Sequence, residues 1–213
     1  MNARVGLFGG TFDPIHWGHV RAAWAACNGA NLTNVILIPS ARPPHKNFDT
    51  GTDGAHRLAM CRLAARDNER LDVSDVEIER GGESYTLLTL QHFLGAMPGA
   101  RIVFLLGADA YEDIATWYRV AEALPLVDWV VLRRPGMPTP DLARPLREHA
   151  ALFEPADGAL RLRAGATSIR YLEIPETPVS STQVRRAIRE GLTIDELVPP
   201  AVADYIARHG LYR

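Results

Sequence analysis

Short apolar runs alternate with longer amphipathic stretches along this chain. Continuous apolar runs predict strands at residues 4–8, 35–39, 73–78, 102–106, 129–132 and 169–174. Apolar residues at helical spacing predict helices over 17–27, 56–66, 85–94, 181–190 and 199–209. Strands that alternate with helices form parallel β-α-β units with right-handed crossovers. We therefore expect an α/β fold: a Rossmann-like doubly wound, mostly parallel sheet with flanking helices and a small C-terminal helical part.

Residues 135–163 interrupt this alternation. They are rich in proline and carry a mixed charge pattern, although the spacing of apolar residues allows a helix over 142–153. We interpret this segment as a peripheral connection. The last two predicted helices end at Gly191 and Gly210, which suit helix C-caps because glycine readily adopts left-handed backbone angles.

The bulk composition is typical of a globular protein. The 213 residues, 47% hydrophobic and 23% charged, fit one domain over 1–213 with the segment from about 180 to 213 packed on it. A formal charge of −2 gives no sign of a general nucleic-acid binder. We find no signal peptide and no apolar run of bilayer length, so we expect a cytoplasmic protein with no membrane partner. Cys27 and Cys61 lack metal-site spacing and are expected to be buried free thiols.

The loop after the first predicted strand carries the strongest chemical signal. Gly9, Gly10 and Thr11 are followed, after an Asp-Pro turn, by His16 and His19 at the start of a helix. Glycine permits a positive φ and a close approach of the backbone to a ligand, and a helix N-terminus attracts anions. Histidines three residues apart face the same way in a helical turn, and an imidazole with a pKa near neutrality gains positive charge beside a phosphate.

A single histidine here would more often cap a helix or pack in the core, but two on one face after a glycine turn favour a functional site. Gly18 between them removes a side chain that could block the approach of a ligand. The glycine spacing differs from the G-x-G-x-x-G of dinucleotide-binding loops, which disfavours a dehydrogenase.

A second signal lies at the start of the helix over 181–190. Ser180, Ser181 and Thr182 open this helix, and Arg185 follows one turn later. Capping needs only one hydroxyl side chain. Three hydroxyls and a positioned arginine therefore favour a polyphosphate site, such as one for the β- and γ-phosphates of ATP.

Weaker signals follow other strands. His45 and Lys46 come after two prolines; the lysine suits a phosphate but also suits an ordinary solvated loop. Asp109 follows the strand over 102–106 and suits ribose hydroxyls, with helix capping as the alternative. Trp117 could stack on a flat ring, although a tryptophan more often belongs to the core. Residues 84–86, Ser-Tyr-Thr, open a helix that could receive a carboxylate or simply be capped there.

Taken in chain order, these motifs resemble one family. The loop G-G-T-F-D-P-I-H-W-G-H resembles the H-x-G-H signature of the nucleotidyltransferases. P-P-H-K, S-Y-T, G-A-D followed by Trp, R-R-P-G and S-S-T-x-x-R then occur in the order expected for bacterial nicotinate-nucleotide adenylyltransferase. The resemblance extends from Arg4 to about Arg189. It implies adenylyl transfer from ATP to nicotinate mononucleotide, which gives nicotinic acid adenine dinucleotide and pyrophosphate in NAD synthesis.

The same resemblance implies roles at the matching positions. The catalytic residues would be His16 and His19. The ATP-binding residues would be Gly9, Gly10, Thr11, Ser181, Thr182 and Arg185. The nicotinate-nucleotide-binding residues would be His45, Lys46 and Arg134 at phosphate, Tyr85 and Thr86 at the nicotinate carboxylate, Trp117 on the pyridine ring and Asp109 at ribose. Residues 138–165 carry no motif of the family.

The chemistry expected from these motifs is direct transfer. No serine, cysteine or lysine in them has the paired base of covalent catalysis, which favours in-line attack of the mononucleotide phosphate on the α-phosphorus of ATP. Mg²⁺ would be carried by the ATP phosphates, since no carboxylate cluster offers a dedicated protein site. The partners would be ATP and nicotinate mononucleotide. The sequence is compatible with either a monomer or a homo-oligomer. The alternatives are a relative acting on nicotinamide mononucleotide or phosphopantetheine, or using CTP, and a non-catalytic nucleotide-binding sensor.

Overall fold

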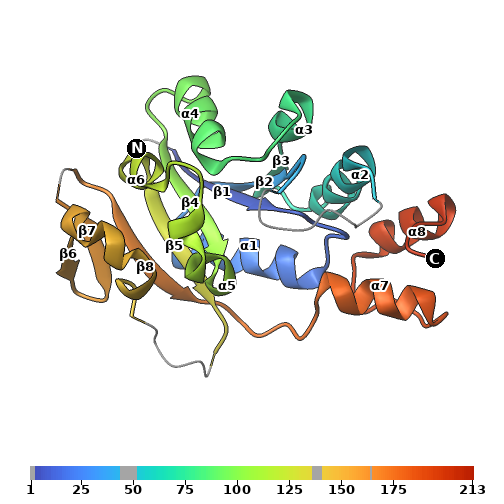
Figure 1. Ribbon diagram of the computed structural model, residues 1–213. Helices are drawn as coiled ribbons and strands as arrows, with labels where there is room; N and C mark the ends of the chain where they lie inside the picture. Colours follow the sequence, from blue (N-terminus) through green and yellow to red (C-terminus); the bar gives the residue numbers. More distant parts are fainter. Residues whose placement is uncertain (1–2, 44–51, 136–140, 164) are drawn as a thin grey trace.

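A β-sheet forms the centre of the molecule (Figure 1). The structure is a computed structural model that describes residues 3–43, 52–135, 141–163 and 165–213. Within these residues the strands are β1 Arg4–Gly10, β2 Asn34–Pro39, β3 Leu71–Val73, β4 Arg101–Gly107, β5 Asp128–Arg133, β6 Phe153–Ala156, β7 Ala159–Leu162 and β8 Ser168–Glu173. They form an eight-stranded sheet in the order β3-β2-β1-β4-β5-β8-β7-β6.

Strand β1 lies between two parallel neighbours. Phe8 is paired with Leu37 of β2 on one side and with Leu105 of β4 on the other. The pairs β2–β3, β4–β5 and β5–β8 are also parallel, while β6 and β7 are antiparallel. Parallel strands end at the same edge of the sheet, so the segments after β1, β4 and β5 leave side by side. This arrangement confirms the predicted Rossmann-like α/β fold.

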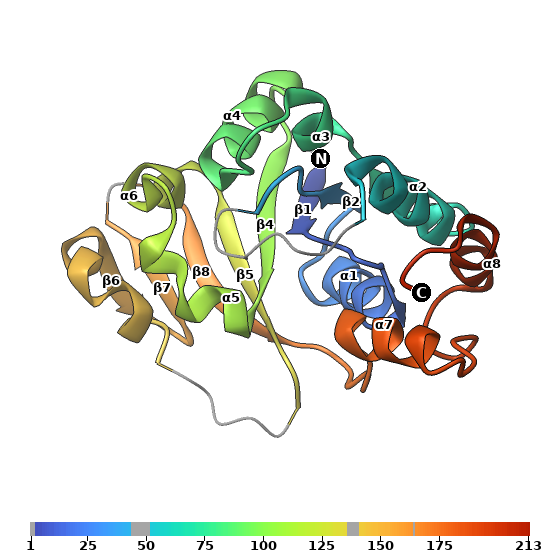
Figure 2. The same cartoon turned by 45° about the vertical axis from the view of Figure 1, so that its right-hand side comes forward.

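Helices cover both faces of the sheet. They are α1 Trp17–Gly29, α2 Gly54–Ala65, α3 Val76–Arg80, α4 Thr86–Ala96, α5 Ala108–Glu112, α6 Val120–Ala123, α7 Ser181–Arg189 and α8 Pro200–His209, with 3₁₀ turns η1 Ile114–Thr116, η2 Leu124–Leu126 and η3 Arg144–Leu152. Figure 2 shows α1 and α4 on opposite sides of the sheet, and α7 and α8 at the end of the molecule away from β6 and β7.

Two hydrophobic cores result from the alternation of side chains along the strands. Val103 and Leu105 of β4 pack into a core with α1, α2, α7 and α8. Ile102, Phe104 and Leu106 of the same strand pack into a second core with α4, α5 and α6. Both faces of the central strands are therefore buried, which explains why these strands are continuous apolar runs in the sequence.

The strand expected over residues 73–78 was wrong. β3 ends at Val73, and α3 begins at Val76. Ser74 separates them, because its Oγ accepts a hydrogen bond from the backbone N–H of Val76 at 3.3 Å. A hydroxyl that bonds the backbone two residues on favours a turn over a continued strand.

The segment over 135–163 was also misjudged as a peripheral connection. The helix allowed over 142–153 is the 3₁₀ turn η3, and β6 and β7 form a hairpin that extends the sheet beyond β8. Its turn is Asp157-Gly158, since Ala156 pairs with Ala159 and Gly158 has φ of 67°. Asp-Gly between two short strands is a recognised hairpin signal, and it could have revealed this one.

The two C-terminal helices end as predicted. Gly210 caps α8 with φ of 60°, and Gly191 follows α7 with φ of 69°. Cys27 and Cys61 are buried free thiols, as expected. None of the helices in the described ranges combines the length and the apolar character that a membrane crossing requires.

Candidate active site

The loop between β1 and α1 begins differently from its prediction. Gly9 and Gly10 belong to the extended strand β1, whereas the left-handed backbone angle falls on Phe12, with φ of 49°. A Cβ on Gly10 would lie 2.9 Å from the tip of the Phe12 ring. Gly10 is therefore required by the packing of that ring, and neither glycine uses the positive φ that this residue type permits.

The two histidines stack on each other at the start of α1. Their ring centroids are 3.8 Å apart, and the ring planes differ by 28°. His16 is the N-cap residue of α1 and is 6% exposed. The Phe12 ring packs edge-on against His19, with centroids 5.0 Å apart. The prediction that both imidazoles face the same way is confirmed.

Gly18 allows His16 to lie in this position. A Cβ on Gly18 would lie 2.8 Å from Cε1 of His16 and 3.3 Å from the carbonyl oxygen of Val179. Real Cβ contacts of 2.8 Å essentially never occur. Gly18 thus makes room for the His16 ring and for the chain that leads into α7, which the sequence interpretation of an open approach did not include.

The surroundings of His16 favour its neutral form. Burial, reinforced by the positive charge of Arg134, lowers the pKa of His16 from 6.5 to about 4. The expectation of a pKa near neutrality was therefore wrong for this ring. Its Nδ1 is buried and has no hydrogen-bond partner among the described residues. A buried nitrogen without a partner is costly, and a ligand that bonds to it would remove that cost.

Helix α7 contacts the histidine loop directly. Nη1 of Arg185 donates a hydrogen bond to the carbonyl oxygen of Asp13 at 2.6 Å, and Oγ of Ser181 donates to that of Pro14 at 3.0 Å. Nη2 of Arg185 donates to Oγ1 of Thr182 at 3.3 Å. The N-terminus of α7 therefore lies against the loop that leads into His16, so the two strongest sequence signals come together.

The three hydroxyls that open α7 have separate roles in this structure. Oγ of Ser180 accepts a hydrogen bond from the N–H of Gln183 at 3.2 Å and so caps the helix. Ser181 bonds to the loop, and Thr182 is exposed beside Arg185. Capping thus accounts for one hydroxyl, which leaves Thr182 and the first N–H groups of α7 for an anion.

Arg57 and Tyr212 are two contributors to this loop that sequence reasoning missed. Arg57 of α2 is fully buried, and its guanidinium donates to the carbonyl oxygens of Thr11 at 2.8 Å and of Ala41 at 3.3 Å. The hydroxyl of Tyr212 donates to Oδ1 of Asp13 at 2.7 Å. An arginine within a helix and a tyrosine near the chain end carry no local sequence signal for such contacts.

The segment Ser-Tyr-Thr lies beside the loop after β2. Oγ of Ser84 accepts a hydrogen bond from the N–H of Ala41 at 2.8 Å, so this hydroxyl holds the loop. Tyr85 is the N-cap residue of α4 without a side-chain cap, and Thr86 is the first residue of the helix. The Tyr85 ring stacks on Tyr118, with centroids 4.3 Å apart. Self-capping therefore does not explain this motif.

Trp117 lies against the middle of β4. It is half-buried, and its ring meets Phe104 edge-on with centroids 6.3 Å apart. A Cβ on Gly9 would lie 3.5 Å from the same Phe104 ring. Phe104 thus connects the end of β1 with Trp117, and Tyr118 next along the chain contacts Tyr85. The residues expected at the pyridine ring and its carboxylate are neighbours.

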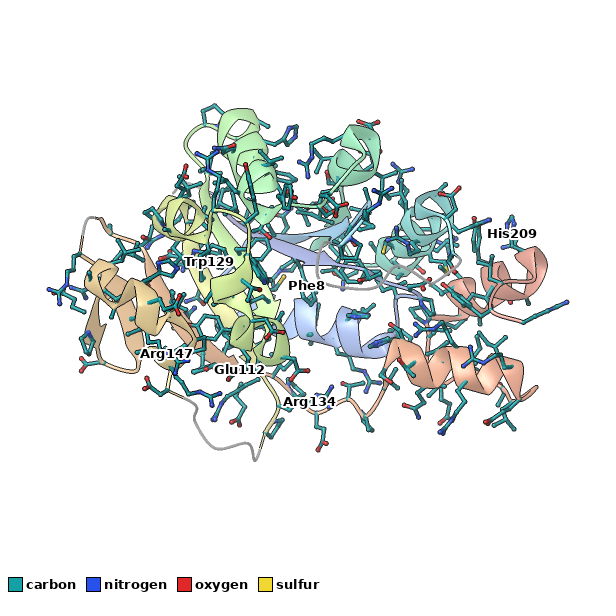
Figure 3. The ribbon with its side chains drawn as sticks, in the orientation of Figure 1. Phe8, Glu112, Trp129, Arg134, Arg147 and His209 are labelled. Carbon is teal, nitrogen blue, oxygen red and sulfur yellow. The ribbon has the colours of Figure 1, made fainter. Side chains whose placement is uncertain are left out.

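Two of the other predicted residues, Asp109 and Arg134, follow the carboxyl ends of β4 and β5. Asp109 is exposed on α5 and is the second residue of this helix, whose N-cap is Gly107, so the capping alternative was wrong. Arg134 is exposed just beyond the end of β5 (Figure 3) and acts electrostatically on His16. His45 and Lys46 lie outside the described residues.

Comparison with known proteins first defines the class. Residues 7–187 match a family model described as Cytidylyltransferase-like, and this range includes the histidine loop and most of α7. The fold agrees with that of "Plasmodium falciparum nicotinic acid mononucleotide adenylyltransferase complexed with NaAD", with a TM-score of 0.72, 18% sequence identity and coverage of 99% of this chain and 98% of that chain. The protein is thus a nucleotidyltransferase.

Relatives at higher identity narrow the class. A protein of Synechococcus sp. (strain JA-3-3Ab), named probable nicotinate-nucleotide adenylyltransferase, is 40% identical over 209 residues, which cover 98% of this chain and 94% of that protein. One of the same name from Symbiobacterium thermophilum (strain DSM 24528 / JCM 14929 / IAM 14863 / T) is 39% identical over 210 residues, with 99% and 95% covered. The chain therefore belongs to the nicotinate-nucleotide adenylyltransferase family, and the resemblance carried by the sequence motifs is confirmed.

Proposed function

We propose that this protein transfers the adenylyl group of ATP to nicotinate mononucleotide, which yields nicotinic acid adenine dinucleotide and pyrophosphate. The observation that carries the proposal is the contact between α7 and the histidine loop. Arg185 and Ser181 bond to the carbonyls of Asp13 and Pro14, within three residues of His16. A triphosphate can then meet two imidazoles, a guanidinium and two helix N-termini at once.

On the ATP side, the residues hold and neutralise phosphate oxygens. His16 and His19 are proposed to bond to the α-phosphate, while Thr182 and Arg185 bind the phosphates that leave as pyrophosphate. Gly9, Gly10 and Thr11 would let the end of β1 lie against the nucleotide. The negative charge of bound phosphates favours protonation, so it raises the pKa of His16 from its depressed value and increases the ring's positive character.

On the acceptor side, the neighbouring Tyr85, Thr86 and Trp117 would bind the nicotinate group of the mononucleotide. The first N–H groups of α4, at Thr86, suit the nicotinate carboxylate, and the indole of Trp117 offers a flat surface for the pyridine ring. Arg134 would bind the mononucleotide phosphate, a role also assigned to His45 and Lys46, and Asp109 would accept hydrogen bonds from ribose hydroxyls.

The reaction is then a direct displacement. An oxygen of the mononucleotide 5′-phosphate forms a bond to the α-phosphorus, and the bond from that phosphorus to the β-phosphate bridging oxygen breaks, so that pyrophosphate leaves. The protein aligns the two phosphates and stabilises the charge that spreads over the equatorial oxygens. We propose that His16 and His19 perform that second task.

Mg²⁺ is proposed to enter with the ATP phosphates. No group of three or more His, Cys, Asp or Glu side chains suited to an ion occurs among the described residues. We expect phosphate oxygens and water to hold the ion, because Mg²⁺ in proteins usually keeps several waters and binds substrate phosphates. When bound, the ion supplies charge neutralisation on the phosphates.

A substrate panel tests the proposal. Purified protein is incubated with ATP and Mg²⁺ plus nicotinate mononucleotide, nicotinamide mononucleotide or phosphopantetheine, and then with CTP in place of ATP. Released pyrophosphate is measured, and the product mass is determined. We expect the largest kcat/KM for ATP with nicotinate mononucleotide. A larger value for another acceptor or for CTP would contradict the substrate assignment, and tight ATP binding without pyrophosphate release would indicate a sensor.

A further inference from the structure

The end of the chain reaches back to the histidine loop. The hydroxyl of Tyr212 donates a hydrogen bond to Oδ1 of Asp13 at 2.7 Å, across 199 positions of sequence. Asp13 is 2% exposed and lies three residues before His16. A bond to a buried carboxylate is among the stronger hydrogen bonds in a protein.

Asp13 is held at more than one atom. Its carbonyl oxygen accepts the hydrogen bond from Arg185 of α7, and its carboxylate interacts electrostatically with Arg57 of α2. Oδ2 is buried without a hydrogen-bond partner among the described residues. Oδ1, the other carboxylate oxygen, is the one that Tyr212 satisfies. Loss of that hydroxyl would leave a buried, charged acceptor short of a donor.

The backbone is strained at Tyr212 and at the residue directly before Asp13. Tyr212 has φ of 65° and Phe12, directly before Asp13, has φ of 49°. Bulky side chains at such angles are strained and persist only where surrounding contacts hold them. The ring of Tyr212 packs against the core that contains α1 and α2, which leaves its hydroxyl to hold the turn at Asp13.

We propose that Tyr212 is a positioning residue for nucleotidyl transfer: its hydroxyl fixes the Asp13 turn, and this turn sets the placement of the stacked His16 and His19. The inference rests on the proposed function. Tyr212 lies outside residues 7–187 that the family model matches. It acts through the loop and not on substrate, so its loss should affect the ATP side of the reaction more than the binding of the mononucleotide.

The chain offers a matched control on α8. The hydroxyl of Tyr205 lies 2.9 Å from Nδ1 of His56, so it joins the C-terminal region to α2 through one hydrogen bond. His56 is not part of the histidine loop. Figure 3 shows α8, with His209 labelled, at the end of the molecule opposite Arg147. Tyr205→Phe therefore removes a comparable tertiary hydrogen bond without touching Asp13.

The experiment compares kcat and both KM values of wild type, Tyr212→Phe and Tyr205→Phe, together with their thermal unfolding midpoints. We expect Tyr212→Phe to lower kcat/KM for ATP by about five- to twentyfold, because the bond it removes ends on a buried charge. The KM for nicotinate mononucleotide should change by less than about twofold, as it should in Tyr205→Phe for both substrates.

A second variant changes the acceptor of the same hydrogen bond instead of its donor. Asp13→Asn removes the charge that the Tyr212 hydroxyl meets and should show the same split between the two substrates. If Tyr212→Phe is as active as Tyr205→Phe, or if Asp13→Asn leaves kcat/KM for ATP unchanged, the positioning role is refuted although the protein is an enzyme. A wild-type protein that releases no pyrophosphate from ATP and nicotinate mononucleotide would refute the proposed function and this inference with it.

Discussion

His16 should make the stability of the ligand-free protein depend on pH below neutrality. The ring is almost fully buried against His19, and burial together with the charge of Arg134 lowers the pKa of His16 to about 4. In the unfolded chain the same imidazole is solvated and has its ordinary pKa of 6.5. Between these two values the unfolded state binds a proton that the folded state does not.

The sign and size of the effect follow from this difference. Where the unfolded state binds more protons, the free energy of unfolding falls as the pH falls. The contribution is fully favourable above pH 6.5 and is lost as the pH falls through the folded value of about 4. One pKa unit corresponds to about 1.4 kcal/mol, so the loss should reach about 3 kcal/mol, a large fraction of the stability of a typical domain.

Urea unfolding at a series of pH values measures how far the free energy of unfolding falls with pH. The substitution His16→Asn removes the imidazole and with it this pH dependence. Asparagine can cap α1, but that gain does not depend on pH, so the pH slope and not the absolute stability is compared. His92→Asn, at an exposed position of α4, controls for the loss of an imidazole. We expect a flatter slope between pH 6.5 and 4 in His16→Asn alone. Equal slopes in all three proteins would show that burial does not depress the pKa of His16.

Three further substitutions test the site. His19→Ala should lower kcat by roughly two orders of magnitude or more without unfolding the protein, as for other lost donors to transition-state charge; a folded, fully active variant would contradict the role. Gly18→Ala should displace the His16 ring, since the new Cβ would lie 2.8 Å from it, and should lower kcat/KM for ATP by roughly tenfold or more; unchanged kinetics would show that the ring can move freely. Trp117→Ala should raise the KM for nicotinate mononucleotide by about tenfold with little change for ATP, because stacking on one base-like ring is worth about 1–3 kcal/mol; an equal rise for both substrates would argue against stacking.

The parts of the fold predicted from sequence are those that local pattern determines. Strands β1, β2, β4 and β5 are buried on both faces, so each is a continuous apolar run. The prediction of one strand over residues 73–78 was wrong because the apolar residues Val73, Val76 and Ile78 lie close together in the sequence. The turn at Ser74 that separates β3 from α3 depends on a single side-chain hydrogen bond. The hairpin of β6 and β7 was not predicted because each of its strands has only 4 residues, which is too short to show a clear alternation of apolar and polar positions.

In the candidate site, too, the residues that belong to local motifs were predicted and those that act through long-range contacts were not. The histidine pair and the hydroxyl-rich start of α7 are local motifs, and each is visible in the sequence. Arg57 and Tyr212 act across 46 and 199 positions, so their contacts leave no periodic trace. The low pKa of His16 depends on the burial of the loop in the folded chain, and no spacing in the sequence contains that information.

These long-range contacts together explain how the loop between β1 and α1 would hold the phosphates of the proposed reaction without a glycine-rich anion nest. The carbonyl oxygens of Gly10, Thr11, Asp13 and Pro14 accept hydrogen bonds from Ser40, Arg57, Arg185 and Ser181 respectively. In a trans peptide the C=O and N–H point in opposite directions, so the amides of Thr11 and Phe12 point away from Ser40 and Arg57. Two guanidiniums bound to the loop also make its surroundings positive, which favours a polyanion. The loop is thus held from behind by α2, α7 and the chain end, and this is the rigidity that catalysis by positioning requires.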